Sequence, residues 1–482
     1  MVLVKIKKQS KPVFNINQFM PYLDPLLKKT IKKDKQLLEK ARLPIVTVSS
    51  TYIEDLKGFH ELPEIDTTSD IVFSRAHYSM ALAVAVQAWG NTIDPTQAWV
   101  VDPTNYVFHS SKFNINFTEA VGKTIARSPF LKKFKDFIDK FARNKLPILD
   151  SITPPLLQLT QDITQPILSL HIVSGNILAE QGKQVFQMVT DPHVRADYLN
   201  QAERPNITFL VFDQPTQQEF LQLAEKLGKK VDPERVIVTG PPVDPRIIAC
   251  RQDKKPWRAG KKLKLCLTTG GLGTNKNEMK QVLQQLLPEL NKPDARYQVM
   301  VYAGTHGDLH NMVKKLARQA DVQLNNISGQ DPADFIMGGK LTKPSWATEI
   351  NQQLQTAPLT LIYHPQIVDA NELLTHFAFP WADGFISKPS GDMAYDAIAS
   401  GSFLLTFQEW GEWEHNIREI FEKKNIAKKA ETKNILYQLE ELATSKADGS
   451  TWISNAMTGA LQLDSLFLSG TKNIVEAVQK IK

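Results

Sequence analysis

The segment ADGFISKPSGDMAYDAIASG, residues 382–401, predicts a buried strand, a tight turn and a helix in direct succession. The strand is expected over Gly384–Ser387, the turn over Lys388–Gly391 and the helix over Asp392–Ala399. The proline of the turn fixes one backbone angle, and its glycine lets the chain bend without a Cβ clash. Because the first amide groups of a helix have no partner inside it, this turn is predicted to bind a phosphate.

The next segment, GSFLLTFQEWGEWEHN, repeats the pattern over residues 401–416. A strand is expected over Phe403–Phe407, followed by a polar loop and by a helix near Asn416. Loops that follow neighbouring parallel strands meet at the carboxyl edge of the sheet, which is where open α/β sheets bind ligands. The two segments therefore predict one shared ligand site.

Together these segments resemble the nucleotide-sugar signature of the glycosyltransferase family that holds monogalactosyldiacylglycerol synthase and the enzyme that adds N-acetylglucosamine to lipid I. The family pattern is K-P-G-G-x-T-x-x-E-A, followed by G-Q-E-x-x-N. The resemblance covers residues 71–105 and 184–435 and implies the GT-B fold, in which two Rossmann-like domains face each other across a cleft. The donor-binding residues that it implies here are Ser390, Gly391, Asp392, Met393, Asp396 (at the acid that holds the ribose), Glu412 and Asn416.

A second glycine turn follows the expected strand at Leu263, in LKLCLTTGGLGTN, and leads into a helix over 278–287 that Pro288 is expected to stop. Its glycines, Gly270, Gly271 and Gly273, allow close approach of a diphosphate or of the facing domain. The alternative is that they serve helix–strand packing. By position in the family, Ile367 and Val368, in the loop after the strand 359–363, are candidates to contact the nucleotide base.

The first domain supplies the candidate catalytic groups. His77 stands at the family's histidine, at the start of a helix over 78–89, while Ser74, Arg75 and Ala76 replace the family's glycines. His77 is therefore a candidate general base and Arg75 a candidate acceptor-side cation. Asp191 and His193 lie in a segment that resembles T-D-x-x-x-H of the lipid-galactosyl enzymes, so Asp191 could orient His77 or act as the base itself, with His193 on the acceptor side. A histidine in a loop is also commonly structural.

The domain boundary is expected near the proline-rich segment around residue 240, which gives an N-terminal acceptor-side domain over 1–247 and a nucleotide-sugar domain over 248–482. In this fold the last helix commonly crosses back to the first domain. The first domain carries a basic N-terminal extension and a helical insertion at about 109–165. Within the insertion, Phe130, Phe134, Phe137 and Phe141 recur at helical spacing among lysines. Such a stripe predicts a membrane-surface helix, or else one that packs on its own domain.

Composition sets the broad class. The chain has 482 residues, 42% of them apolar, and a net charge of +6, which is ordinary for a globular protein of two or three domains. No apolar run has the length of a membrane span, and no signal-peptide core follows the first lysines, so we expect a cytoplasmic protein, or one that is peripheral on the inner face of the cell membrane. The two cysteines predict neither a disulfide framework nor a metal site. The basic runs lack the aromatic platforms of a nucleic-acid binder.

The resemblance to this glycosyltransferase family implies transfer of a hexosyl or N-acetylhexosaminyl group from a nucleotide diphosphate sugar, most often UDP-linked, to a lipid-type acceptor at the membrane surface, with inversion. No D-x-D motif follows a strand near the donor turn, so neither a metal nor a cofactor beyond the UDP-sugar substrate is expected. Two alternatives remain: a UDP-N-acetylglucosamine 2-epimerase of the same fold, and an inactive sugar-nucleotide-binding protein. The missing first glycine loop and Met393, in place of threonine, keep the last alternative open.

Overall fold

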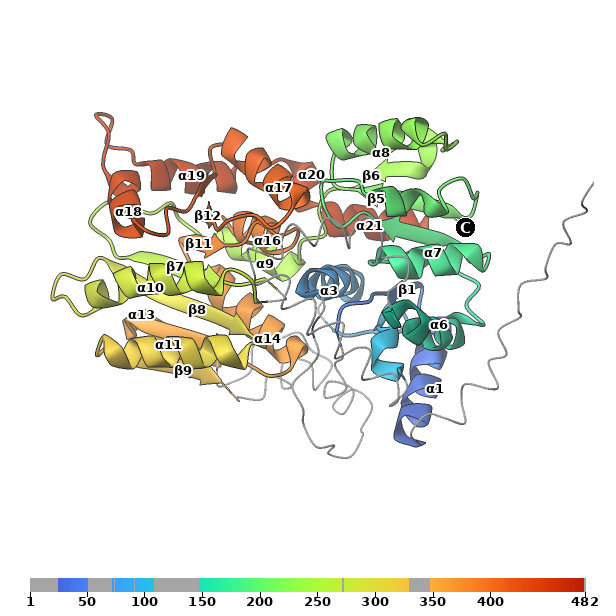
Figure 1. Ribbon diagram of the computed structural model, residues 1–482, viewed down its shortest axis with the longest axis horizontal. Helices are drawn as coiled ribbons and strands as arrows, with labels where there is room; N and C mark the ends of the chain where they lie inside the picture. The colour runs from blue at the N-terminus through green and yellow to red at the C-terminus, as the bar shows by residue number, and fades with distance from the viewer. Residues whose placement is uncertain are drawn as a thin grey trace, which may run out of the picture.

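The computed structural model describes residues 25–50, 72, 74–90, 92–107, 147–270, 273–328 and 347–480. These residues form two α/β units, each built on a fully parallel sheet, which lie side by side in Figure 1. The expected fold class of two Rossmann-like domains is confirmed. Among the described helices, none has both the length and the apolar character that crossing a bilayer requires.

The sheet of the first domain has the strand order β2-β1-β3-β4-β5-β6. Its strands are β1 Leu43–Val46, β2 Ala98–Val101, β3 Ile167–Ser169, β4 Val185–Met188, β5 Ile207–Val211 and β6 Val236–Val238. The helices of this domain are α1 Pro25–Lys40, α3 Arg75–Trp89, α6 Pro147–Thr160, α7 Ile172–Glu180 and α8 Gln214–Lys226. Most of these strand residues are buried because helices cover the parallel sheet, as their β-branched and apolar composition predicts.

The sheet of the second domain has the order β13-β12-β11-β7-β8-β10-β9. Its strands are β7 Leu263–Thr268, β8 Tyr297–Gly304, β9 Leu324–Ser328, β10 Leu359–Tyr363, β11 Gly384–Ser387, β12 Phe403–Thr406 and β13 Ala427–Lys429. Its helices are α10 Lys276–Leu290, α11 Gly307–Gln319, α13 Ala347–Thr356, α14 Ile367–Leu373, α15 Phe379–Trp381, α16 Met393–Ala399, α17 Glu412–Lys423, α18 Ile435–Ala443 and α19 Trp452–Leu461. A π-helical turn, Leu374–Ala378, joins α14 to α15.

Two of the expected element boundaries are wrong by three residues. Helix α10 continues through Pro288 to Leu290. A proline so close to the end of a helix removes only one backbone hydrogen bond, and the buried leucines of the last turn hold it in place. Helix α3 begins at Arg75 rather than Tyr78, because the side chain of Ser74 caps it by accepting a hydrogen bond from the amide of His77 at 3.4 Å. Arg75 and His77 therefore lie on the first helical turn.

The insertion expected at 109–165 is described only from residue 147, where α6 begins. Phe130, Phe134, Phe137 and Phe141 lie outside the described residues. The membrane-facing stripe therefore stays a prediction.

The chain passes between the domains twice. After β6 it runs through the short helix α9, Pro245–Ala249, into the second domain. After α19 it returns through α20, Ser465–Leu468, to α21, Gly470–Gln479, which packs on α3 (the red helix among the blue and green elements in Figure 1). The side-chain amide of Asn473 donates to the carbonyl of Thr239 at 2.8 Å.

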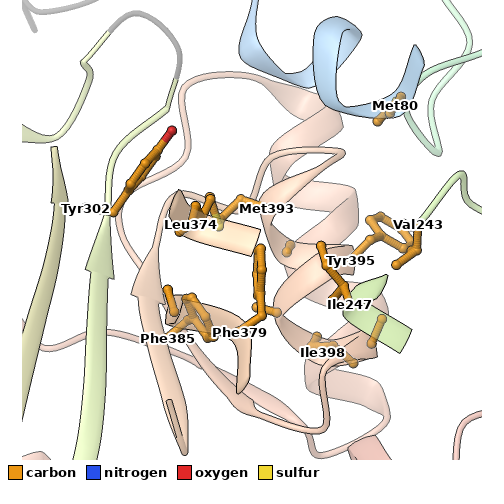
Figure 2. Packing of buried hydrophobic residues seen from close by; sticks show 14 of the residues in the cluster. Met80, Val243, Ile247, Tyr302, Leu374, Phe379, Phe385, Met393, Tyr395 and Ile398 are labelled. Carbon is orange, nitrogen blue, oxygen red and sulfur yellow. The ribbon is translucent and has the colours of Figure 1, made fainter. Parts of the chain in front are cut away.

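One apolar cluster joins the two domains. It includes Met80 of α3 as well as Met393 and Tyr395 of α16, and the linker contributes Ile247. Figure 2 shows Met80 on its helix above α16, with the linker residues on the side of Tyr395. The domains are therefore in apolar contact behind the edges of their sheets.

Candidate functional site between the two sheets

α/β folds bind ligands at a switch point, where two neighbouring strands connect onward in opposite directions along the sheet, and each sheet has such a point. These points lie between β1 and β3 in the first sheet and between β7 and β11 in the second. The carboxyl edges of the two sheets meet there. A Cβ atom on Gly391, after β11, would lie 2.6 Å from the carbonyl oxygen of Thr190 and 2.6 Å from Oδ1 of Asp191, both after β4. Only a glycine fits this approach, so the turn faces the loop that sequence analysis assigned to the acceptor side.

The turn after β11 is occupied by its own side chains. Ser390 Oγ donates to Asp392 Oδ1 at 2.6 Å and accepts from the amide of Met393 at 3.4 Å. The prediction that these amide groups are unpaired is therefore wrong for Met393. Asp392 is the N-cap of α16, so a carboxylate already lies where the sequence predicted a bound phosphate.

Arg75 connects this turn to the first domain. Its Nη2 atom lies 3.2 Å from Asp392 Oδ2 and 4.0 Å from Asp396 Oδ2, and its Nη1 atom donates to Asn371 Oδ1 at 3.0 Å. Burial opposes the guanidinium charge, but Asp392, Tyr302 and Asp396 together outweigh it, and the pKa of Arg75 is raised. Arg75 is thus an interdomain ion-pair residue.

Asp396 is a different kind of acid from Asp392. Burial, together with the charges of Asp392 and Asp244, raises the pKa of Asp396 well above its usual value, although Arg75 opposes the shift. For Asp392, burial also favours the neutral acid, but Arg75 and Ser390 outweigh it and lower the pKa. Asp392 is therefore the ionised partner of Arg75, whereas burial shifts Asp396 toward its protonated form.

His77 contacts Thr190, the residue that precedes Asp191. His77 Nε2 is 3.3 Å from Thr190 Oγ1, which in turn is 3.5 Å from the hydroxyl of Tyr198. Burial and then the charge of Arg195 lower the pKa of His77 to about 4. Burial raises the pKa of Asp191 to about 7, with Arg195 opposing and the carboxylates of Glu414 and Asp392 adding to the shift. A general base is most effective when its pKa is close to the working pH, so Asp191 is the better candidate.

We expect His77 to be uncharged at neutral pH. In a ¹⁵N- or ¹³C-resolved NMR titration of its imidazole, the midpoint should lie near pH 4, with the signal assigned from a His77→Gln variant. Since this pKa is below that of an unfolded histidine, about 6.5, protonation favours the unfolded chain, and stability should fall as the pH drops from about 6.5 toward 4. A midpoint at pH 6 or above would contradict the claim that burial lowers the pKa of His77.

The glycine loop after β7 belongs to the second domain and lines one hollow together with Val72 and Arg75 of the first domain. Thr269 Oγ1 donates to the carbonyl of Thr274 at 2.9 Å and closes the loop, and Gly273 has a φ of 62°, which favours glycine. Gly271 lies outside the described residues. The hollow that borders this loop has a volume of about 10 Å³, room for about one water molecule, and it is lined from both domains by Val72, Arg75, Thr269, Gly270, Tyr302, Gly304, Thr305, His306 and Ile367. This volume is below the roughly 300–1,000 Å³ of small-molecule sites, so a nucleotide sugar requires the domains to separate further.

The candidate base-contacting residues lie on a helix rather than a loop. Ile367 and Val368 form the first turn of α14, and both are buried. They pack in the apolar cluster of the first domain, with Tyr78 and Leu82. Ile367 also lines the hollow, whereas Val368 serves the domain contact.

The segment before and within α17 divides into exposed and buried acids. Glu412 is exposed, and Asn416 donates across the interface to the carbonyl of Pro192 at 3.4 Å. Sequence analysis missed Glu414, which is fully buried: its Oε2 accepts from the amide of Trp410 at 2.6 Å, and its Oε1 lies 2.6 Å from Lys388 Nζ. The signal was available, because Glu414 shares a spacing of three and four with the buried Ile417 and Phe421.

His193 pairs with an acid on α8 of its own domain. Its Nδ1 atom lies 3.0 Å from Oε1 of Glu219 on α8, and this hydrogen bond raises the pKa of His193. Its acceptor-side role stays a prediction.

Unpaired buried oxygens mark the carboxyl edges of both sheets. The side-chain oxygens of Thr47 and Ser50 after β1, Thr274 after β7 and Thr406 at the end of β12 have no hydrogen-bond partner among the described residues. Buried polar atoms are nearly always satisfied by protein, water or ligand. These oxygens therefore indicate where water or a ligand binds. No group of three or more His, Cys, Asp or Glu side chains in the described part of the chain has the arrangement of a metal site.

Comparison with known proteins gives structural matches alone. No family model and no curated protein matches the sequence. The structure is similar to a glycosyltransferase from Rickettsia africae ESF-5 (TM-score 0.40, 10% identity, 92% of this chain and 100% of that one). It is also similar to MurG of Acinetobacter baumannii (0.43, 12%, 91% and 99%) and to a putative UDP-N-acetylglucosamine 2-epimerase from Listeria monocytogenes (0.45, 10%, 91% and 96%). At this level of similarity the fold rests on the two sheets themselves.

The structure thus brings together most of the residues that sequence analysis selected. Asp191 and His77 of the first domain meet Gly391 and Asp392 of the second, with Arg75 between them. Glu412 and His193 lie outside this group. Sequence analysis did not select Tyr198 and Arg195, beside Thr190 and Asp191, or Glu414 and Thr274, near the glycine loop. Thr190 and Lys388 lie in the quoted motifs, but sequence analysis gave them no role.

Proposed function

We propose that this protein is a glycosyltransferase that moves a hexosyl or N-acetylhexosaminyl group from a UDP-linked sugar to a lipid-type acceptor, with inversion at the anomeric carbon. The observation that carries the proposal is the position of Asp191. This acid has a pKa of about 7 and contacts Gly391 across the meeting carboxyl edges of two parallel sheets. A base in that place can serve an acceptor held by the first domain and a donor held by the second.

In the proposed reaction the donor lies on the second domain, with its diphosphate at the Gly270–Thr274 loop. Asp191 takes the proton from the acceptor hydroxyl while that oxygen bonds to the anomeric carbon. The bond from this carbon to the diphosphate breaks, and UDP leaves with the electron pair. Asp396, buried on the first turn of α16, is the candidate contact for a ribose hydroxyl.

The rival activity, epimerisation of UDP-N-acetylglucosamine, is favoured by the number of acids at the interface. Asp191, Asp392, Asp396 and Glu414 belong to one electrostatic cluster, since each perturbs or is perturbed by another member. Proton abstraction from a sugar carbon needs such acids in more than one protonation state. An inactive binding protein is favoured instead by the carboxylate of Asp392, because it lies in the turn where the sequence predicted a bound phosphate.

Incubation with radiolabelled UDP-glucose, UDP-galactose and UDP-N-acetylglucosamine in the presence of membrane lipids distinguishes the three. Label in the lipid phase is the expected result. A converted sugar that remains on the nucleotide identifies the epimerase and overturns the transferase. Calorimetric binding of the UDP-sugar without either product identifies the inactive protein.

Removal of divalent metal is expected to leave transfer intact. The proposed contacts to the leaving group are protein amides and side chains. EDTA at a concentration on the order of 5 mM should therefore lower the turnover by less than about twofold, measured as label transferred per minute. A dialysed protein that receives buffer alone is the control. Loss of activity that Mg²⁺ restores would contradict this prediction.

A further inference from the structure

Lys388 and Thr274 come from two loops that follow adjacent strands, β11 and β7. Both border the same point in space: a Cβ atom on Gly270 would lie 3.5 Å from Thr274 Oγ1 and 3.7 Å from Lys388 Nζ. The ammonium and the hydroxyl are therefore no more than about 7 Å apart. A single phosphate group, accepting at about 2.8 Å through two of its oxygens, can bridge them.

Both groups have hydrogen-bonding capacity left. Thr274 is 3% exposed, and its hydroxyl has no hydrogen-bond partner among the described residues. The side chain of Lys388 is 13% exposed, and its ammonium has Glu414 as its ionic partner, 2.6 Å away. An ammonium has three donors, so one carboxylate oxygen does not satisfy it.

Glu414 and Trp410 hold the ammonium in place from the side of α17. Glu414 is fixed by the amide of Trp410, and Lys388 Nζ lies 5.6 Å from the centre of the Trp410 ring. Arg75 is the other cation near this loop: its Nη1 atom donates to Asn371, and its Nη2 atom lies 3.2 Å from Asp392 and has no hydrogen-bond partner among the described residues. The start of α16 is occupied by Ser390 and Asp392.

From these contacts we infer that Lys388 Nζ and Thr274 Oγ1 form a phosphate-binding pair at the glycine loop, and that Glu414 is a positioning residue for Lys388. The ligand class is a phosphate of a nucleoside diphosphate, which rests on the proposed function. The pair itself predicts that a phosphate group binds, whatever nucleoside or sugar that phosphate carries. Glu414 orients the ammonium of Lys388 toward Gly270, and a bound phosphate then shares this ammonium with Glu414.

The test compares calorimetric binding of UDP, uridine and inorganic pyrophosphate at one ionic strength. Lys388→Met should weaken UDP and pyrophosphate binding by about tenfold or more and leave uridine binding unchanged, because a charge-assisted hydrogen bond is lost only with phosphate. Thr274→Val, of similar size, should weaken UDP binding by roughly threefold to tenfold. Lys276→Met is the matched control: Lys276 lies just after the same loop, pairs with Asp308 on the surface and should not change any of the three affinities.

Because Lys388→Met leaves Glu414 buried without its cation, the double variant Lys388→Met/Glu414→Gln removes both charges together. Glu414→Gln alone should weaken UDP binding less than Lys388→Met, and it should have no further effect in the Lys388→Met background. A purely structural role for Glu414 would instead give additive losses.

The outcomes separate this inference from the proposed function. If the native protein binds UDP and Lys388→Met binds it equally well, the phosphate pair is wrong and the transferase proposal is unaffected. If the native protein binds pyrophosphate through Lys388 but shows no preference for UDP over it, the pair is supported and the UDP-sugar donor is overturned. If it binds neither ligand, both are overturned.

Discussion

Asp191→Asn is expected to lower the turnover of sugar transfer by a factor of about 10²–10⁴, which is the usual contribution of a general base. Asparagine keeps the size of the side chain beside Gly391 but cannot accept the acceptor's proton. The Michaelis constant for the UDP-sugar should change little, because the donor contacts lie on the second domain. The measurement is initial-rate kinetics with saturating lipid acceptor.

The pH dependence of the native enzyme supports or contradicts the same assignment. The carboxylate form of Asp191 is the base, so turnover should rise as the pH increases through about 7 and should level off above it. Burial also gives a control for folding. Since the folded-state pKa is above that of an unfolded aspartate, ionisation of Asp191 destabilises the folded chain as the pH rises from about 4 to 7. Asp191→Asn should therefore melt at pH 8 at the same temperature as the native protein or higher.

His77 provides the comparison variant. His77→Gln keeps an acceptor or donor for Thr190, and a neutral imidazole with a pKa of about 4 is a weak base, so its effect on turnover should be smaller than that of Asp191→Asn. The reverse order would assign the base to His77. Equal turnover in Asp191→Asn and the native protein would remove Asp191 from the mechanism.

Arg75→Met is expected to lower the free energy of unfolding by about 3–5 kcal/mol, because it leaves the buried carboxylate of Asp392 without its cation. The lost partners belong to two helices of the second domain, α14 and α16, so the interface between the domains should weaken most. Urea unfolding monitored by circular dichroism at pH 7 measures the loss, and separate transitions for the two domains are expected in place of one.

Two further variants define this effect. Arg75→Met/Asp392→Asn removes both charges and should recover much of the loss, which a double-mutant cycle converts into the coupling energy of the pair. Arg296→Met removes an arginine whose partner, Glu440, is also exposed, and it should cost about 0–1 kcal/mol. A loss below about 1 kcal/mol for Arg75→Met would show that the interdomain ion pair does not hold the domains together.

The elements around the site could be predicted from the sequence where local chemistry sets them. The strand Gly384–Ser387 is short, apolar and bounded by Asp383 and by the proline of the turn, and its observed bounds agree with the prediction. The first turn of α3 was placed too late because a serine cap is a weaker signal than the alanine-rich run that follows.

The contacts that define the site could not be predicted in the same way. Sequence analysis expected the amides near Asp392 to bind a phosphate. In the structure the carboxylate of Asp392 pairs with Arg75 of the other domain, 317 positions away in the chain, and only the folded structure shows this contact. The desolvation that separates the pKa of Asp191 from that of His77 likewise depends on packing between domains. Glu414 had a local signal in its spacing to Ile417, yet the resemblance drew attention to Glu412 instead.

The return of α21 to the first domain has a consequence for biosynthesis. Ile474 and Val478 of this helix complete the apolar cluster that contains Val84 and Ala85 of α3. The ribosome adds roughly 5–20 residues per second, so the stretch between β6 and α21 takes on the order of 10–50 s to synthesise. During that interval the apolar face of α3 lacks its partner helix. A chaperone, or the growing second half of the same chain, is then expected to protect this face from aggregation with other chains.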